Sequence, residues 1–321
     1  MRRKTWIVSI LAIGIILICS GCSRIITVGG GSSSFEKGTF RFNGLERSYL
    51  IQVPAGSKTE PMPLILALHG GGGTARSMCA MPGGLAEPAR KAGYLLVCPN
   101  GVDRHWNDGR NIQTWHAHAE GIDDAGFLIA LIDHLSLQYP IDQERIFASG
   151  ISNGGQMSYR LACERSDRIR AIAPVVASMA ITLDCDPTDP VSILIINGTE
   201  DPLVPYKGGE IRALRRGLGT VRPTSEVLQF WAGHNHCEVE AKRSQEPDRS
   251  PEDGTRIWRL EYDGCSSDTH VILYEIEGGG HTWPGANQYL PQFLIGRLSQ
   301  DMLASEVIID FFEALIQQPG S

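Results

Sequence analysis

The segment Gly150-Ile151-Ser152-Asn153-Gly154 decides the fold of this 321-residue chain. It follows the apolar run RIFAS at residues 145–149 and precedes a helical pattern over residues 156–162. An apolar strand, a sharp turn and a helix, with serine at the centre of G-x-S-x-G, form the pattern of a nucleophile elbow. The flanking glycines allow a tight backbone turn, which lifts the Ser152 hydroxyl clear of the sheet edge.

Two further chemically reactive residues follow later apolar runs. Asp201 comes after the run at residues 191–197, and His281 comes after the run at 271–276. Sheets built from parallel strands place their ligand chemistry at the carboxyl ends of those strands. The order serine, acid, histidine is that of α/β-hydrolases. We therefore predict Ser152 as a nucleophile, His281 as the base that takes its proton, and Asp201 as the carboxylate that orients the imidazole.

Attack by a serine produces an oxyanion, which needs hydrogen-bond donors already in place. One predicted donor is the backbone N–H of Asn153, directly after the nucleophile. The second is expected from the glycine run at residues 70–73, which follows the apolar strand pattern LILAL at 64–68. Gly71 and Gly72 are both candidates, and the sequence does not choose between them.

Strand and helix patterns alternate along the chain, which predicts an α/β fold with a mostly parallel central sheet and helices on both faces. Two N-terminal strands are expected to pair antiparallel, and the charge-dense segment 242–254 is expected to be a solvated loop. The predicted strands are 39–42, 48–53, 64–68, 94–98, 145–149, 169–173, 193–197 and 271–276, and the predicted helices are 77–92, broken at 82–84, 123–139 and 306–317.

Four motifs, LILALHGGGGTA, GISNGGQMSYRLAC, INGTEDPLVPY and GGGHTWPG, together resemble a known family. They are similar to motifs of secreted esterases that include polyhydroxybutyrate depolymerase-like and feruloyl esterase-type enzymes. The resemblance runs from about Gly38 to the C-terminal helix, and it implies an α/β-hydrolase that cleaves carboxylic esters. It assigns Ser152, Asp201 and His281 the roles given above. Depolymerases of this type often carry a cysteine and a glutamine in the oxyanion segment, where this chain has glycines and Thr74, which argues against polymer hydrolysis more than against esterase activity.

Aromatic side chains are candidates for the walls of a substrate site. Trp283 lies two residues after His281, and Trp106 lies in the loop after the predicted strand 94–98. Flat aromatic walls suit cinnamoyl or sugar rings. Trp106 and Trp283 are predicted as substrate-binding residues ahead of Trp115.

The N-terminus has the pattern of an export signal. A basic start, residues 1–4, precedes an apolar stretch, residues 6–18, that is too short for a comfortable membrane span. Small residues just before Cys22 resemble a bacterial lipoprotein signal, with Cys22 as the lipidated residue; secretion after simple cleavage is the alternative. We predict a signal peptide over 1–21, a flexible tether over 22–37 and one catalytic domain over 38–321.

Export permits disulfides, and six cysteines lie beyond Cys22. Proximity in sequence favours Cys163–Cys185 and Cys237–Cys265. Cys79–Cys98 ranks below them, because Cys98 ends the predicted strand 94–98 and a small buried hydrophobic residue would explain it equally well. Two close histidine pairs lack the framework of a zinc site, so we expect no metal and no cofactor. The net charge is −7, with no basic stripe beyond the first four residues, so nucleic acid is not an expected partner.

The sequence therefore predicts an extracytoplasmic serine carboxylesterase, held at the bacterial cell envelope by its lipid anchor or secreted. The expected substrates are feruloyl or acetyl-type esters, or short hydroxyalkanoate esters, in small or oligomeric form. Polymer films are expected to be poorer substrates, because no residues are left for an added surface-binding domain. The alternatives are a peptidase of the same fold and a non-catalytic lipoprotein that binds envelope glycan.

Overall fold

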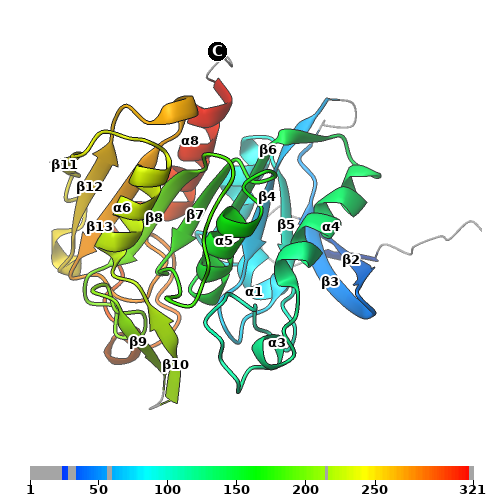
Figure 1. Ribbon diagram of the computed structural model, residues 1–321, viewed down its shortest axis with the longest axis horizontal. Coiled ribbons are helices and arrows are strands. Elements are labelled where there is room, and N and C mark those ends of the chain that lie inside the picture. Colours follow the sequence, from blue (N-terminus) through cyan, green and yellow to red (C-terminus); the bar gives the residue numbers. More distant parts are fainter. Residues whose placement is uncertain (1–23, 28–33, 56–59, 214–215, 318–321) are drawn as a thin grey trace, which may run out of the picture.

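The computed structural model describes residues 24–27, 34–55, 60–213 and 216–317. An 11-stranded sheet runs through the molecule in the order β1-β2-β3-β5-β4-β6-β7-β8-β13-β12-β11 (Figure 1). A separate two-stranded sheet pairs β9 (Gly209–Ala213) with β10 (Arg216–Val221). The strands of the large sheet are β1 (Arg24–Thr27), β2 (Ser34–Phe42), β3 (Leu45–Gln52), β4 (Met62–Leu68), β5 (Leu95–Pro99), β6 (Ile141–Ile151), β7 (Ala171–Val175), β8 (Ser192–Gly198), β11 (Ala241–Gln245), β12 (Arg256–Tyr262) and β13 (Val271–Glu277).

The middle of the sheet is parallel and its two edges are antiparallel. Strands β5, β4, β6, β7, β8 and β13 run parallel to one another. At one edge β1, β2 and β3 continue antiparallel from β5, and at the other β12 and β11 continue antiparallel from β13. The predicted antiparallel N-terminal pair is thus confirmed, and so is the mostly parallel centre.

Helices cover both faces of the sheet. On one face α4 (Asp124–Ser136), α5 (Asn153–Glu164) and α6 (Thr224–His234) pack into one apolar cluster. On the other face α1 (Ala75–Cys79), α2 (Ala86–Lys91) and α8 (Ala304–Gln317) pack into a second. The remaining short elements are α3 (His116–Ala119), α7 (Gln292–Ile295) and the 3-10 turns η1 (Pro251–Asp253) and η2 (Ser266–Asp268).

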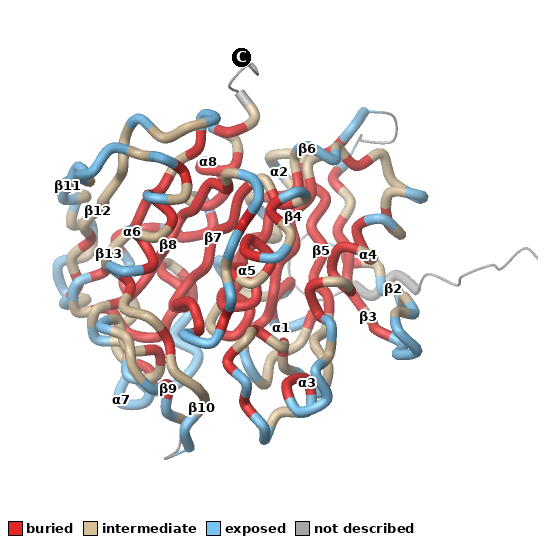
Figure 2. The backbone as a smooth tube through the Cα atoms, viewed as in Figure 1, coloured by how far each residue is buried: buried red, intermediate tan, exposed pale blue. Residues whose placement is uncertain are grey.

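The central strands are buried on both sides, as Figure 2 shows by the red tube through the middle of the molecule. Side chains alternate between the two faces of a strand. In β4, Leu64, Leu66 and Leu68 enter the cluster under α4–α6, whereas Ile65 and Ala67 enter the cluster under α8. A continuous apolar run such as LILAL is therefore what a parallel strand covered by helices requires.

Two sequence-based boundaries need correction. Strand β2 begins at Ser34 and β1 spans Arg24–Thr27, so part of the predicted tether 22–37 belongs to the sheet, and the catalytic domain starts before residue 38. Phe35 is only 3 % exposed and packs against the second cluster, which explains why the strand extends to this point. The predicted signal peptide and Cys22 lie outside the described residues.

The predicted loop over 242–254 is also partly wrong, because β11 (Ala241–Gln245) pairs with β12 at the sheet edge. Lys242 and Arg243 lie in this strand, and charged side chains are a common protection of exposed sheet edges. Among the described residues, no helix combines the length and hydrophobicity needed to cross a membrane.

Three disulfides join the six cysteines of the described chain: Cys79–Cys98, Cys163–Cys185 and Cys237–Cys265. The two favoured pairings are confirmed, and the third, which ranked lowest, forms as well. Disulfides persist in oxidising compartments and are rare in the cytosol of most organisms. The three bonds are therefore typical of a protein that folds outside the cytoplasm.

Candidate active site

Ser152 lies in the sharp turn between β6 and α5, with φ 55° and ψ −121°. A positive φ is uncommon for a residue with a side chain, and such strain concentrates at functional sites. The turn is tight because Gly150 and Gly154 bring their own backbones and that of Leu68 into close contact. A Cβ at either glycine would collide with these backbone atoms, which gives a physical reason for both glycines of the elbow.

His281 and Asp201 form a buried pair, with Nδ1 of His281 2.7 Å from Oδ2 of Asp201. Their side chains are 4 % and 2 % exposed. The carboxylate accepts, so Nδ1 carries the proton and Nε2 is left to accept one. The other carboxylate oxygen of Asp201 accepts the backbone N–H groups of Leu203 and Val204, at 2.8 and 2.9 Å, which fixes its orientation.

Strand pairing explains why these two residues meet across 80 positions of sequence. Asp201 follows β8 and His281 follows β13, and these strands are parallel neighbours in the sheet. Their following turns also bind each other: the N–H of Glu200 donates to the Gly279 carbonyl at 2.9 Å, and the N–H of Gly278 donates to the Thr199 hydroxyl at 2.9 Å. The segment after His281 is held as well, since the Tyr289 hydroxyl donates to the His281 carbonyl at 3.0 Å.

The glycine run lies beside the elbow, and its hydrogen bonds separate the two candidate oxyanion donors. A Cβ built on Gly70 would lie 3.6 Å from Cβ of Ser152. The Gly72 N–H donates to the Arg104 carbonyl at 2.9 Å, so it is already used. Within the described chain the Gly71 N–H has no hydrogen-bond partner. This removes Gly72 from the candidates and leaves Gly71.

His69, just before the glycine run, ties the run to the next loop. Its Nε2 accepts the Gly101 N–H at 3.0 Å, so its Nδ1 carries the proton and donates to the Gly70 carbonyl at 2.9 Å. Burial lowers the pKa of His69 to about 4, which keeps the ring neutral near pH 7.

Trp106 and Trp283 do not present the open ring faces that the sequence analysis expected. Trp106 is fully buried, and its indole N–H donates to the His69 carbonyl at 3.0 Å. Trp283 is 2 % exposed, and its indole N–H donates to the Ser305 hydroxyl at 3.0 Å. Both are packing residues in this structure, because Trp106 belongs to the apolar cluster under α4–α6 and Trp283 to the cluster under α8.

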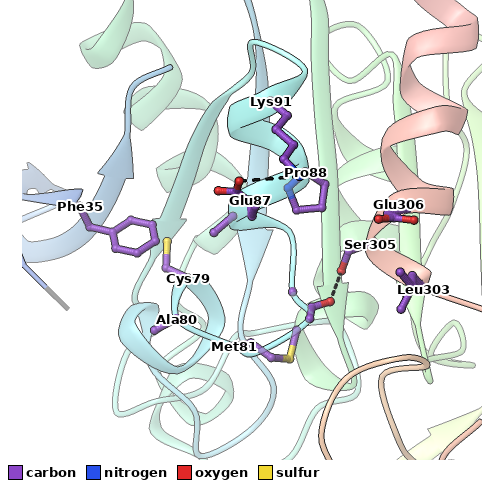
Figure 3. Close-up of a pocket in the computed structure, with 13 residues that line it drawn as sticks. Phe35, Cys79, Ala80, Met81, Glu87, Pro88, Lys91, Leu303, Ser305 and Glu306 are labelled. Carbon is purple, nitrogen blue, oxygen red and sulfur yellow. Dashed lines mark hydrogen bonds and ion pairs between the residues drawn. The ribbon is translucent and has the colours of Figure 1, made fainter. Parts of the chain in front are cut away.

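A cavity of about 350 Å³ lies near Ser305, between α1, α2 and the start of α8. Figure 3 shows the residues that line it. Ser305 lies at its wall, where its hydroxyl donates to the Gly83 carbonyl at 2.6 Å. Ser152, Asp201 and His281 are not among the lining residues, so this cavity is separate from the elbow. The remaining lining residues are Phe35, Cys79, Ala80, Met81, Gly84, Ala86, Glu87, Pro88, Lys91, Leu303 and Glu306.

A buried polar network behind Asn153 was not predicted from the sequence. The side-chain amide oxygen of Asn153 accepts the backbone N–H of Trp106 at 2.8 Å. The amide nitrogen of the same side chain donates to the backbone carbonyl of Trp106 at 3.0 Å and to the Asp108 carboxylate at 2.5 Å. Asp108 in turn binds the Arg110 guanidinium, with Nη2 to Oδ2 at 2.7 Å. The only signal in the sequence is polar residues in a loop that also carries Trp106, and such a pattern is equally typical of a solvated turn.

Comparisons with known proteins find esterases. The family model of the polyhydroxybutyrate depolymerase esterases matches residues 47–180. A relative named "Probable feruloyl esterase C" from Aspergillus niger is 27 % identical over 288 residues, covering 88 % of this chain and 92 % of its own. Feruloyl esterase C of Emericella nidulans is 31 % identical over 186 residues, covering 56 % and 63 %.

The chain is an α/β-hydrolase that cleaves carboxylic esters. Its resemblance to polyhydroxybutyrate depolymerase-like and feruloyl esterase-type enzymes, indicated by the motifs, is confirmed. Among solved structures it is similar to an S-formylglutathione hydrolase from Agrobacterium tumefaciens, with 17 % identity and a TM-score of 0.42, over 56 % of this esterase and 80 % of that chain.

Proposed function

We propose that this esterase acts outside the cytoplasm on small or oligomeric carboxylic esters, through Ser152, His281 and Asp201 and a covalent acyl-enzyme. The observation that carries the proposal is the buried 2.7 Å pair of His281 and Asp201 at the ends of β13 and β8. Nε2 of His281 is left as an acceptor, and Ser152 follows β6, which runs parallel to β8 and β13, so all three residues follow the carboxyl ends of parallel strands.

The proposed reaction has two steps with the same proton carrier. Nε2 of His281 takes the hydroxyl proton of Ser152 as its Oγ bonds to the scissile carbonyl carbon. The backbone N–H groups of Asn153 and Gly71 would donate to the resulting oxyanion, each worth roughly 3–4 kcal/mol of barrier. His281 returns its proton to the leaving alkoxide as the ester C–O bond breaks, and a water activated by the same nitrogen then releases the acid.

The substrate class rests on the relatives and on the chain's own residues. Two relatives are named feruloyl esterases, which favours esters of hydroxycinnamic acids. Acetylated sugars and short hydroxyalkanoate esters are the other members of the proposed class, and glycines replace the residues that depolymerases often carry near the oxyanion. We therefore rank soluble aromatic or sugar-linked esters ahead of polymer films.

The test of the catalytic roles compares Ser152→Ala with Ser158→Ala, a matched loss of a hydroxyl further along α5. We expect Ser152→Ala to reduce turnover of p-nitrophenyl acetate about 10⁴- to 10⁶-fold while the fold is retained, and Ser158→Ala to keep most of it. Near-normal turnover by Ser152→Ala would show that another residue is the nucleophile.

The same preparation separates the substrate classes. Methyl ferulate, an acetylated xylo-oligosaccharide, hydroxybutyrate oligomers and a polymer film are compared with a peptide amide. Turnover of the soluble esters above the film supports the ranking. Rapid clearing of the film without action on the sugar-linked or aromatic esters would reverse it, and preferred cleavage of the peptide amide would indicate a peptidase instead.

A further inference from the structure

The loop after β5 brings two aromatic rings to the glycine run, and the proposed mechanism does not use them. A Cβ built on Gly71 would lie 3.4 Å from Cη2 of Trp115, 3.5 Å from Cδ2 of His105 and 3.8 Å from Cβ of Asn153. Gly71 and Asn153 are the two proposed oxyanion donors, so both ring edges lie beside the position of the scissile carbonyl. Neither ring is fully buried.

The two rings contact each other in a tilted arrangement, with centroids 4.0 Å apart and an interplanar angle of 31°. The Arg110 guanidinium lies 5.1 Å from the Trp115 ring, within the range of a cation–π contact. His105 is held by its Nδ1–H, which donates to the Asp103 carbonyl at 2.8 Å. The pair is therefore a fixed feature of the loop and does not depend on a single contact.

Buried hydrogen bonds tie this pair to the proposed oxyanion donor. Arg110 is bound to Asp108, and Asp108 accepts from the Asn153 amide. The same loop is anchored to α4, because the Asn107 N–H donates to Asp124 at 2.8 Å and Asp124 pairs with Arg47 at 2.7 Å. A rigid connection of this kind holds the rings at a set distance from the carbonyl, which a specificity wall requires.

We propose that Trp115 and His105 form the wall that receives a planar aryl-acyl group, and so determine the preference for aromatic acids. This inference rests on the proposed function of Ser152 and its oxyanion site. A cinnamoyl ester is one conjugated plane that starts at the carbonyl, so a wall beside the oxyanion donors meets that plane directly. Ring edges carry partial positive charge and attract the face of another π system, which favours an aryl-acyl group over an alkyl one.

The test compares Trp115→Ala and Trp115→Phe with Trp258→Ala, which removes a tryptophan from β12 near the far edge of the sheet. Kinetics are measured with methyl ferulate, methyl butyrate and phenyl butyrate. We expect Trp115→Ala to raise KM for methyl ferulate about tenfold relative to methyl butyrate. Trp115→Phe should keep most of the wild-type preference for methyl ferulate over methyl butyrate. Trp258→Ala should leave the ratio of the two KM values unchanged.

Equal changes for methyl ferulate and methyl butyrate would reduce Trp115 to a packing residue and overturn the inference. A selective loss with phenyl butyrate would also overturn it, because the wall would then face the alcohol. If Trp115→Ala does not fold, His105→Ala gives the same comparison from the second ring. A wild-type protein that hydrolyses none of these esters would contradict the proposed function itself, so the two failures are distinguishable.

Discussion

At the scale of single residues, His69 links the active-site loops to the stability of the fold. Its pKa is lowered from 6.5 to about 4 by burial. Between these values the unfolded chain binds a proton that the folded chain does not, so stability falls as the pH decreases through this window. Linkage gives a loss of about 2.5 kcal/mol at pH 4.5 relative to pH 7.5. Burial also lowers the pKa values of His105 and His118, which adds in the same direction.

Urea unfolding at pH 7.5, 5.5 and 4.5 measures this effect as the free energy of unfolding. His69→Gln is the matched control, because it removes the titrating group and keeps a polar side chain at the position. We expect the wild type to lose more stability than His69→Gln on acidification, by about the amount that linkage gives. If the free energy of unfolding falls equally in the two proteins on acidification, His69 is protonated in the folded state.

Some roles of single residues could be predicted from the sequence and others could not. The spacing of the motifs predicted Ser152, Asp201 and His281 as a set, and the hydrogen bond between the last two agrees with it. The choice of Gly71 over Gly72 depends on the Arg104 carbonyl, which reaches the run from another loop. Trp106 was expected at a substrate wall for its position in the chain, but a position in a loop does not say which way the loop folds.

At the scale of elements, the disulfides offer a comparison between two loops of similar length. Cys163–Cys185 closes a sequence separation of 22 and Cys79–Cys98 one of 19. The entropic contribution of each is about 3 kcal/mol. Cys79 and Cys98 are also both buried, in the cluster between the sheet and α8, so their removal adds a loss of packing.

We therefore expect the double variant Cys79→Ala/Cys98→Ala to be less stable than Cys163→Ala/Cys185→Ala, although the chain-entropy terms are nearly equal. Thermal unfolding of the two double variants and the wild type, under identical non-reducing conditions, measures the order. A lower melting temperature for the Cys163 and Cys185 variant would indicate that the bond at the end of α5 stabilises more than its loop length implies.

Elements were predictable where a strand is buried by helices on both sides, as in β4 and β8, because the apolar run is then continuous. Strands were not predicted where pairing with a neighbouring strand, and not burial of an apolar run, stabilises them. Strand β11 is charged and exposed, and it is a strand because it hydrogen-bonds to β12 at the sheet edge. The strands β9 and β10 are short and mix glycines with charged and apolar residues, so their sequence carries little periodic signal.

At the scale of the whole molecule, the order of strands in the sheet brings Asp201 and His281 together, and that order cannot be predicted from the sequence pattern alone. Strand β13 enters the sheet next to β8 after β9 to β12 have intervened in the chain. This crossover places His281 beside Asp201, so the triad order could be predicted from the α/β-hydrolase pattern, but the neighbouring strands could not be derived from local propensities. The same order leaves β1 at one outer edge, directly after the predicted lipidation site.

The position of β1 at this edge connects the sheet to the cellular location of the protein. The basic start, the short apolar stretch and Ser20-Gly21-Cys22 predict a lipid on Cys22, two residues before β1 begins at Arg24. A lipid there would hold the edge of the sheet close to a membrane surface, because little chain lies between them. Cys22→Ala should leave the membrane fraction or remain unprocessed, whereas Cys19→Ala, a matched cysteine loss within the same segment, should be lipidated normally. Fractionation of cells followed by mass spectrometry of the mature N-terminus checks both variants, and an unmodified N-terminal residue in the wild type would favour simple secretion over anchoring.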